Sequence, residues 1–311
     1  MTAFAGKRRR ALRLLRGEAS HWQLYLLALP AIVYILVFCY KPMYGIIIAF
    51  KDFTFRGGVA GSKWVGLKHF NRLFSSYWFP IILKNTLSIS ILSILITFPA
   101  PIILALMVNE VSGARLRKVF QTVSYAPHFI STVVMCGMVI LFLKPSSGLI
   151  NNALAAMGYE RQYFMQNPAY FKWIYVLSDV WQNTGWNAII YFAALSAIDR
   201  SQVEAAQVDG ASRLQIIRHV NLPVLVPTVM VMLILKCGQV MNVGYEKVYL
   251  LQNDANLTGS EVISTFVYKM GLQSNEYSFS TAAGLMNSVV NAIVLLLANT
   301  LSRRLTQSSL W

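Results

Sequence analysis

SQVEAAQVDGASRLQIIRHVNLP, residues 201–223, is the longest polar and helix-compatible stretch between two apolar segments in the second half of the chain. Ser201 and Glu204 have the S-x-x-E spacing of a capping box, which predicts that a helix begins there. Gly210 interrupts the helical pattern at a point where the backbone can turn sharply. Pro223 opens the next apolar run, and proline suits the first turn of a helix. The stretch therefore predicts a helix, a turn and a second helix outside the membrane.

The two predicted helices of this stretch carry different side chains. Ala205 and Ala206 keep one side of the first helix narrow, whereas Arg213 and Arg218 place positive charge on the second. A narrow face beside a charged rim is suited to insertion into a cleft on another protein. The simpler interpretation is an ordinary capped loop helix, which a capping box alone would satisfy.

The composition of the 311-residue chain is typical of a membrane protein. Apolar residues make up 56% of the chain and charged residues 13%. The mean hydropathy is +0.52, which does not suit a soluble domain of this size. Six apolar segments reach the roughly 20 residues that cross a bilayer as a helix. They are 22–40, 81–108, 119–143, 171–198, 224–243 and 282–301. We expect an all-α integral membrane protein with six transmembrane helices and the helix of 201–223 between spans four and five.

The formal net charge of +15 raises the question of nucleic-acid binding, because basic clusters attract phosphates. The basic residues are spread along loops between apolar segments, however, and no helix-turn-helix, zinc-finger or RNP motif occurs. The density of Lys and Arg near span ends places both termini and the 201–223 loop in the cytoplasm. We therefore expect a basic cytoplasmic segment at 1–21, a six-span domain at 22–305 and a cytoplasmic tail at 306–311. The expected surroundings are lipid and not nucleic acid.

The fourth apolar segment carries a polar stripe. Asp179, Gln182, Asn183 and Trp186 recur at i, i+3, i+4 and i+7, so they share one face of a helix. A carboxylate inside a membrane is costly and marks a cavity or a partner. Planar amides beside aromatic rings are suited to carbohydrate recognition, so this face is a candidate solute site. Hydrogen bonding between helices is the alternative, which Asn and Gln also provide.

The fifth apolar segment carries a second polar group, with Gln239 and Asn242 on the turns that follow Lys236. The ammonium of Lys236 is expected to pair with Asp179, which is the simpler interpretation. Alternatively it meets an anionic group on a solute. We predict that these residues line the same pathway as the polar face of the fourth segment.

The chain has no motif for catalysis or for nucleotide binding. G-x-x-x-x-G-K-[ST], H-E-x-x-H and G-x-S-x-G are all absent from the sequence. Cys39, Cys136 and Cys237 lie singly in apolar segments, so neither a disulfide framework nor a metal site is predicted. We expect no enzyme activity and no cofactor on this chain. Active transport would take its energy from an ion gradient or from an ATPase on another chain.

The 201–223 stretch resembles the EAA loop of ABC importer permeases. That pattern is E-A-A, three residues, G, nine residues, an aliphatic residue, one residue and L-P, and Val220 stands where the family usually has Ile. The residues that match it or lie within it are Glu204, Ala205, Ala206, Asp209, Gly210, Leu222 and Pro223. KPMYGIIIAFKDF, QTVSYAPHFIS, GWNAIIYFAALSAID and the final LW are similar to the oligosaccharide branch of the carbohydrate importers, with its MalF-type and LplB-type subunits.

The resemblance implies a permease in a bacterial cell (inner) membrane that pairs with a second, homologous permease. Two cytoplasmic ATPases would bind ATP and Mg, and an extracytoplasmic solute-binding protein would deliver an oligosaccharide. In that family the EAA helix sits in a cleft on the ATPase, with Glu204 and Gly210 as the sensitive positions. Solute contacts lie in the spans on either side of this loop, and transport proceeds by alternating access. Lys236 would suit an acidic sugar such as an alginate or pectin fragment, and neutral sugars remain equally open.

Two other functions are compatible with parts of the sequence. An ion-coupled secondary transporter would use Asp179 and Lys236 as its coupling pair, and its uptake would follow a proton or sodium gradient. A membrane scaffold for an ATPase would bind partners without dependence on a solute. Neither accounts for the full spacing of residues 201–223.

Overall fold

The computed structural model describes residues 22–306, and most of them are helical. The predictions made for residues 1–21 and 307–311 lie outside the described residues. Within the described part, the strands are a single antiparallel pair of two residues each, so the mostly helical class is confirmed. The chain divides into two compact units, Met1–Gly66 and Leu67–Trp311.

The first unit is a long apolar helix followed by a small hairpin. Its elements are α2 (Trp22–Tyr34), η1 (Ile35–Tyr40), α3 (Lys41–Met43), η2 (Tyr44–Phe50), β1 (Lys51–Asp52), α4 (Gly58–Gly61) and β2 (Lys63–Trp64). The first four form one continuous helix of 29 residues, and its most apolar window has no residue buried within the chain. Such a helix needs an apolar environment from outside, as in a membrane. The predicted first span, 22–40, ends before this helix does.

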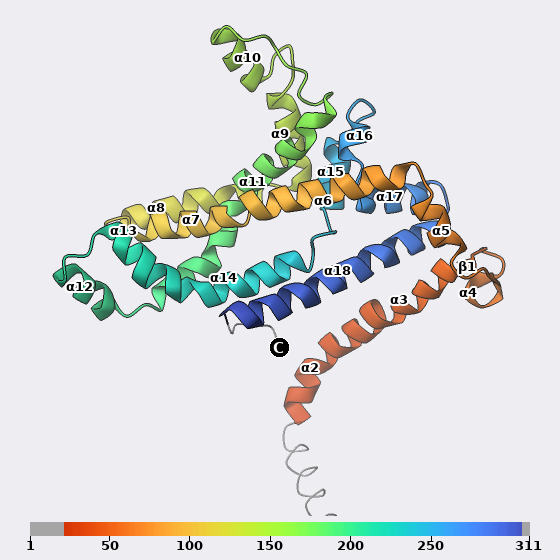
Figure 1. The fold of residues 1–311 in the computed structure, drawn as a ribbon, viewed down its shortest axis with the longest axis horizontal. Coiled ribbons are helices and arrows are strands. Elements are labelled where there is room, and N and C mark those ends of the chain that lie inside the picture. Colours follow the sequence, from red (N-terminus) through yellow and green to blue (C-terminus); the bar gives the residue numbers. More distant parts are fainter. Residues whose placement is uncertain (1–21, 307–311) are drawn as a thin grey trace, which may run out of the picture. The chain divides into compact units, whose positions relative to one another are not determined.

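The second unit contains all the remaining elements (Figure 1). Those of its first half are α5 (Lys68–Phe74), α6 (Trp78–Ile96), α7 (Pro99–Asn109), α8 (Ala114–Tyr125), η3 (Ala126–Phe129), α9 (Thr132–Phe142), α10 (Leu149–Ala156) and α11 (Pro168–Ser196). Those of its second half are α12 (Arg200–Val208), α13 (Arg213–Ile216), η4 (Ile217–Asn221), α14 (Leu222–Cys237), α15 (Tyr245–Leu251), α16 (Leu257–Ser260), α17 (Ile263–Tyr268), η5 (Lys269–Gln273) and α18 (Tyr277–Thr306).

Four helices of the described part are long and apolar enough to cross a membrane. They are Trp22–Phe50, Trp78–Asn109, Arg213–Cys237 and Tyr277–Arg304. They overlap the predicted first, second, fifth and sixth spans, with different bounds. The fourth predicted span, 171–198, lies in α11, a continuous helix of 29 residues that is not among the four. Its polar residues lower its hydropathy.

The third predicted span, 119–143, is not one straight helix. Its two halves, α8 with η3 and then α9, meet at 95° across a short break. Pro127 lacks a backbone donor, and Ile130 and Ser131 are extended. Ser131 then accepts a hydrogen bond from the N–H of Val134 and begins α9 as its N-cap. If this bent pair is one broken span, the described residues hold five candidate spans.

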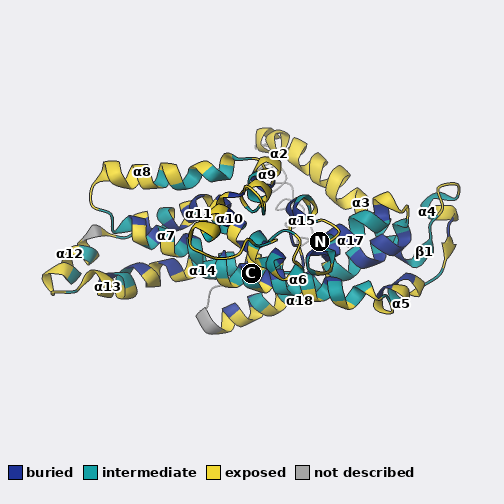
Figure 2. Cartoon of the chain, turned by 90° about the horizontal axis from the view of Figure 1, so that it is seen from above, coloured by how far each residue is buried: buried dark blue, intermediate teal, exposed yellow. Residues whose placement is uncertain are grey.

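α11 is the helix around which the second unit packs. It contacts α6, α7, α8 and α14. Phe171 and Val176 pack with residues of α9 and α15 near its start, and Ala188 and Leu195 pack with residues of α7 and α14 near its end. Figure 2 shows that most of the described residues of α12, α13 and α8 are exposed. Because α11 is buried toward both ends, it holds its polar residues at fixed positions among these helices.

Gly185 allows α11 to lie very close to the end of α8. A Cβ atom at this position would lie 2.0 Å from the carbonyl oxygen of Ser124, which is shorter than any non-bonded contact. Only glycine permits this approach. Gly185 therefore allows the end of α8, just before the break in the third predicted span, to pack directly against α11.

Candidate functional site

α12 begins before the predicted capping box. Asp199 accepts a hydrogen bond from the backbone N–H of Ser201 at 3.0 Å and is the N-cap, so the helix begins at Arg200. The predicted capping box of Ser201 and Glu204 is therefore wrong, because Ser201 already lies inside the helix. The short carboxylate of Asp199 accepts the free N–H of Ser201 instead, and its hydrogen bonds with Ser201 lower its pKa.

Gly210 makes the predicted turn after α12. Its φ is +79°, in the left-handed region that favours glycine. The N–H of Gly210 donates to the carbonyl of Gln207 at 3.0 Å, and the N–H of Ala211 donates to that of Ala206 at 2.9 Å. This pair of bonds is a Schellman motif, which satisfies the last carbonyls of a helix. The reversal of the chain therefore depends on a backbone conformation that other residues adopt only with strain.

α13 continues directly into the fifth predicted span. It begins with a capping box between Ser212 and Gln215, passes through the π-helical turn η4 and runs on as α14 to Cys237. Pro223 lies in the first turn of α14, as predicted. The wider π-helical turn before it suits a proline, whose ring would crowd an ordinary preceding turn. The loop and the span thus form one continuous helix of 25 residues.

The α12–α13 segment lies at one end of the second unit, at the left in Figure 1, and most of its surface is not covered by other parts of the chain. The side chains of Glu204, Ala205 and Asp209 are exposed. Val208 and Leu214 are 88% and 75% exposed, although both are apolar. Large apolar side chains beside charged ones at an exposed turn are typical of a surface that binds another protein.

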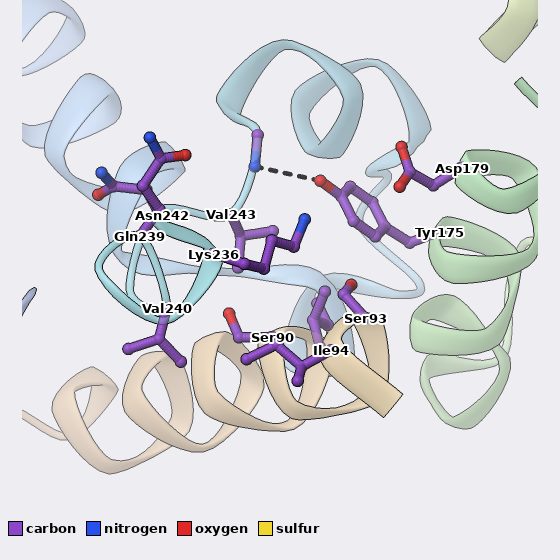
Figure 3. A pocket seen from close by; sticks show the side chains of 12 residues that line it. Ser90, Ser93, Ile94, Tyr175, Asp179, Lys236, Gln239, Val240, Asn242 and Val243 are labelled. Carbon is purple, nitrogen blue, oxygen red and sulfur yellow. Dashed lines mark hydrogen bonds between the residues drawn. The ribbon is translucent and has the colours of Figure 1, made fainter. Parts of the chain in front are cut away.

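A polar cavity of about 220 Å³ lies between α6, α11 and the end of α14 (Figure 3). It brings together Asp179 with Lys236, Gln239 and Asn242, four of the predicted pathway residues. Its remaining polar lining is Ser90, Ser93, Tyr175 and the backbone of Gly244. An adjoining cavity of about 230 Å³ shares Asp179, Lys236 and Gln239 and extends to Asn187 and Tyr191.

The other three residues of the predicted α11 face bind the break between α8 and α9. Gln182 donates from Nε2 to the carbonyl of Ile130 at 2.9 Å. Asn183 Oδ1 lies 2.9 Å from Nδ1 of His128, whose ring stacks on Trp186 with centroids 4.5 Å apart and planes 6° apart. These contacts support the alternative interpretation of hydrogen bonding between helices for this part of the face.

Asp179 pairs with Lys247 rather than with Lys236. Lys247 Nζ lies 3.7 Å from Asp179 Oδ1 and donates to the carbonyl of Tyr175 at 2.8 Å. The expected pair between Asp179 and Lys236 is therefore wrong, because the carboxylate is already engaged by a lysine of α15. Within residues 22–306, Lys236 forms no ion pair and points into the polar cavity (Figure 3).

Lys247 was not among the predicted pathway residues, because the sequence places it in a loop. It is only 6% exposed, and this burial lowers the pKa of its ammonium, partly opposed by the charge of Asp179. A signal was present in the sequence. Residues 247, 248 and 251 lie on one face of a short helix, and Val248 and Leu251 are buried with the lysine.

Asn242 comes from a turn and not from a helix. α14 ends at Cys237, so the predicted fifth span, 224–243, is helical only in part. Gly238 begins the turns that follow, and it lies close against Leu295 of α18. Asn242 Oδ1 accepts hydrogen bonds from Asn287 at 2.8 Å and from Asn291 at 3.1 Å. Two amides of α18 thus orient the side chain of Asn242 at the cavity.

No group of three or more His, Cys, Asp or Glu side chains within residues 22–306 is placed to hold a metal ion. The cavity instead offers an ammonium, amides and hydroxyls. Such groups bind carboxylates and sugar hydroxyls by hydrogen bonds.

The family model described as "Binding-protein-dependent transport system inner membrane component" matches residues 97–307. The chain is 41% identical over 305 residues to the polygalacturonan/rhamnogalacturonan transport system permease protein YteP of Bacillus subtilis (strain 168), covering 98% of this chain and 95% of that protein. It is 38% identical over 313 residues to protein LplB of the same organism, covering 98% of each.

The structure is similar to two solved transporter structures. One is a bacterial ABC transporter involved in the import of the acidic polysaccharide alginate, with 44% identity, a TM-score of 0.87, and 94% and 99% of the two chains covered. The other is a bacterial alginate ABC transporter in complex with an alginate pentasaccharide-bound periplasmic protein. It is 43% identical, with a TM-score of 0.88, and 96% and 100% of the chains are covered.

Proposed function

The chain belongs to the family of binding-protein-dependent transport system inner membrane components, and from this premise we propose that it is the permease of an importer of acidic oligosaccharides. The predicted resemblance to ABC importer permeases is thereby confirmed. The chain is an integral membrane permease of the ABC sugar importers. The observation that carries the proposed substrate is the polar cavity into which Lys236 points.

The proposed topology has six spans, with α11 as the fourth and the bent α8–α9 pair as the third. A helix of 29 residues is about 43 Å long, which exceeds the roughly 30 Å of a bilayer core. α12 and α13 then lie on the cytoplasmic side of the bacterial inner membrane, together with both termini. The loops with α5, α10 and α15–α17 face outward. Polar residues in α11 are sheltered because neighbouring helices surround them.

The proposed coupling element is the α12–α13 turn. Its exposed residues, Glu204, Ala205 and Asp209 with Val208, insert into a cleft on a cytoplasmic ATPase, which binds ATP and Mg on its own chain. Ala206 is half-buried and backs this surface, and the turn is shaped by Gly210. Movement of the turn passes through Leu222 and Pro223 into α14, because the helix is continuous there.

The assembly proposed for this permease includes a second homologous permease, two ATPases and an extracytoplasmic solute-binding protein. ATP binding closes the ATPases, and the cavity then opens outward toward the docked binding protein. Hydrolysis returns the cavity to the inside. The solute shifts this equilibrium only through its different affinity for the two states.

The proposed solute is an oligosaccharide with carboxylate groups. Lys236 has no ion-pair partner among the described residues, so its ammonium is available to a uronate carboxylate. Gln239 and Asn242 offer amides to the sugar hydroxyls beside it. One relative is named for the transport of polygalacturonan, a polymer of a uronic acid. One similar structure is that of a transporter involved in the import of the acidic polysaccharide alginate. The ion-coupled alternative depends on a pair of Asp179 with Lys236, which the structure does not contain.

The substrate proposal is tested by substitution of Lys236 in the complex that copurifies with the chain, reconstituted in liposomes. Lys236→Gln should lower the import rate of an alginate or galacturonate trisaccharide about tenfold or more, because a charge-assisted hydrogen bond is lost. Lys236→Arg keeps the charge and should retain most of the rate. Import of an acidic trisaccharide at the wild-type rate by Lys236→Gln would reject this role.

A further inference from the structure

Three tyrosines form an aromatic cluster on α15 and α17. The ring centroids of Tyr245 and Tyr249 lie 5.6 Å apart, those of Tyr245 and Tyr268 4.7 Å apart, and those of Tyr249 and Tyr268 5.4 Å apart. Every ring thus contacts the other two. Aromatic contacts at these separations are favourable and hold the rings in defined orientations.

The cluster is a surface feature and not part of the core. Tyr249 is 38% exposed, and Tyr245 and Tyr268 are half-buried. Positions 245 and 249 share one face of α15, because they are one helical turn apart. The opposite face of the helix carries Lys247, whose ammonium is bound by Asp179 and by the carbonyl of Tyr175. The aromatic face is therefore carried by a helix that the contacts of Lys247 hold in place.

One tyrosine of the cluster lines a cavity that adjoins the polar cavity. Tyr245 lines a third cavity of about 280 Å³, together with Lys247, Gln182 and Asn183. This cavity shares Tyr175, Asp179 and Gly244 with the polar cavity that contains Lys236. Through Tyr245 the cluster thus borders a cavity beside the polar cavity. In the proposed topology α15 and α17 face outward, so a solute that arrives from outside would pass this cavity on its way to Lys236.

The chemistry of the cluster suits a sugar ring. One face of a pyranose is lined by C–H groups, which pack on an aromatic ring, while its hydroxyls lie around the edge. Gln273 donates from Nε2 to the Tyr249 hydroxyl at 3.3 Å, so an amide stands beside the rings to bind such hydroxyls. Tyrosine supplies this amphipathic contact at a low cost in conformational entropy.

The charges around this third cavity also favour contact with the ring of a sugar over contact with its carboxylate. Glu246 lies between Tyr245 and Lys247 and lines the same cavity. Lys247 lines this cavity too, but it is already paired with Asp179. The negative charge of Glu246 therefore opposes an anionic group here, whereas Lys236, without an ion-pair partner among the described residues, attracts one in the adjoining cavity. A uronate chain would therefore place a sugar face on the tyrosines and a carboxylate at Lys236.

We propose that Tyr245, Tyr249 and Tyr268 form a stacking site for one sugar ring of the transported oligosaccharide, at the outward mouth of the cavity. This site rests on the proposed function and adds a position to the route that lies outside the spans. It receives the sugar as it leaves the binding protein, before the sugar reaches the polar cavity.

The test compares Tyr249→Leu and Tyr268→Leu with the matching Phe variants in the full reconstituted complex. The binding protein is saturated with an alginate trisaccharide, and both import rate and affinity of the binding protein for the complex are measured. Each Leu variant should import about two- to tenfold more slowly, because one aromatic contact is lost. The Phe variants should retain most of the rate, and binding-protein affinity should stay unchanged. Tyr159→Leu, an exposed tyrosine on another loop, is the control and should match the wild type.

Three results would overturn the proposal, each in a different way. Weaker docking of the binding protein in the Leu variants, whether or not sugar is bound, would make the tyrosines a protein-docking surface. Unchanged import with unchanged docking would leave them as an ordinary interfacial aromatic belt. Loss of the copurifying subunits from both Leu variants, but not from the Phe variants, would make the cluster structural. Absence of trisaccharide import by the wild type would instead contradict the proposed function.

Discussion

The ammonium of Lys247 in α15 lies 3.7 Å from the carboxylate of Asp179 in α11, and it donates a hydrogen bond to the carbonyl of Tyr175. Gly244, just before α15, donates its N–H to the Tyr175 hydroxyl at 3.1 Å (Figure 3). These contacts fasten α15, the short helix that carries Tyr245 and Tyr249. An ion pair that is mostly buried is costly to form and more costly to break on one side.

Removal of one partner from this pair should destabilise the protein more than removal of both. Asp179→Asn keeps an oxygen for Asn183 but leaves the ammonium of Lys247 buried without its counter-charge. Because the carboxylate of Asp179 is 24% exposed and the pair is 3.7 Å long, we expect a loss of about 1–3 kcal/mol in the free energy of unfolding for this variant. The double variant with Lys247→Met should recover part of that loss, as measured by unfolding in detergent. Strictly additive effects of the two substitutions would contradict the coupling.

The stability of the protein should rise with pH in the alkaline range because of Lys247. Burial lowers the pKa of this lysine from its ordinary value of 10.5, so the folded protein binds the proton less tightly than the unfolded chain. Unfolding then takes up a proton between the lowered pKa and 10.5, and stability increases as pH rises through that window. The melting temperature of the wild type relative to Lys247→Met should increase accordingly. Lys84→Met removes an exposed lysine and should leave the dependence of the melting temperature on pH as it is in the wild type. The same dependence in all three proteins would reject the assignment of this effect to Lys247.

Gly185→Ala should be strongly destabilising, although alanine favours helices. The new Cβ would collide with the backbone of Ser124, so α11 and α8 would have to separate, at a cost of about 1–3 kcal/mol. Gly137→Ala in α9 is the matched control, because a Cβ there meets nothing within 4 Å. This control should be neutral or more stable by up to about 1 kcal/mol. Similar melting temperatures for the two variants would show that the close helix contact is unimportant.

Gly210→Ala should weaken binding of the ATPase without loss of the fold. Space for a Cβ exists at this position, but φ of +79° costs a residue other than glycine about 1–2 kcal/mol. Gly210→Asn should be milder, because asparagine tolerates the left-handed region. The ATPase recovered by pull-down from native membranes should decrease in the order Gly, Asn, Ala, while the second permease remains bound. Equal recovery of the ATPase from all three proteins would show that the conformation of this turn is not needed for binding of the ATPase.

The local pattern of residues 201–223 predicted its helix, turn and helix, because Gly210 and Pro223 act through their own backbones. Long apolar runs predicted four of the spans for a similar reason, since composition alone decides them. The start of α12 was mispredicted because Asp199 and Ser201 are both suitable N-cap residues two positions apart. Sequence spacing does not show which of the two wins.

The pairing of charges could not be predicted, because it depends on how distant segments meet. Asp179 and Lys236 lie in adjoining spans and line one cavity, yet Lys247 reaches the carboxylate from a short helix in a later loop. The break at Ile130 likewise turns Gln182 and Asn183 toward a backbone carbonyl and a histidine. Helical periodicity placed these side chains on one face but could not identify what that face meets.

The most direct test of the account is uptake of a labelled alginate trisaccharide by liposomes that contain the complete copurified complex. We predict that uptake requires ATP on the side of the liposome membrane where the ATPases lie and depends on the loaded binding protein. Vanadate should block this uptake, and Lys236→Gln should lower it. Proton or sodium gradients imposed without ATP should drive no uptake. Uptake that follows an ion gradient and ignores vanadate would contradict the account, and it would mark the chain as a secondary transporter.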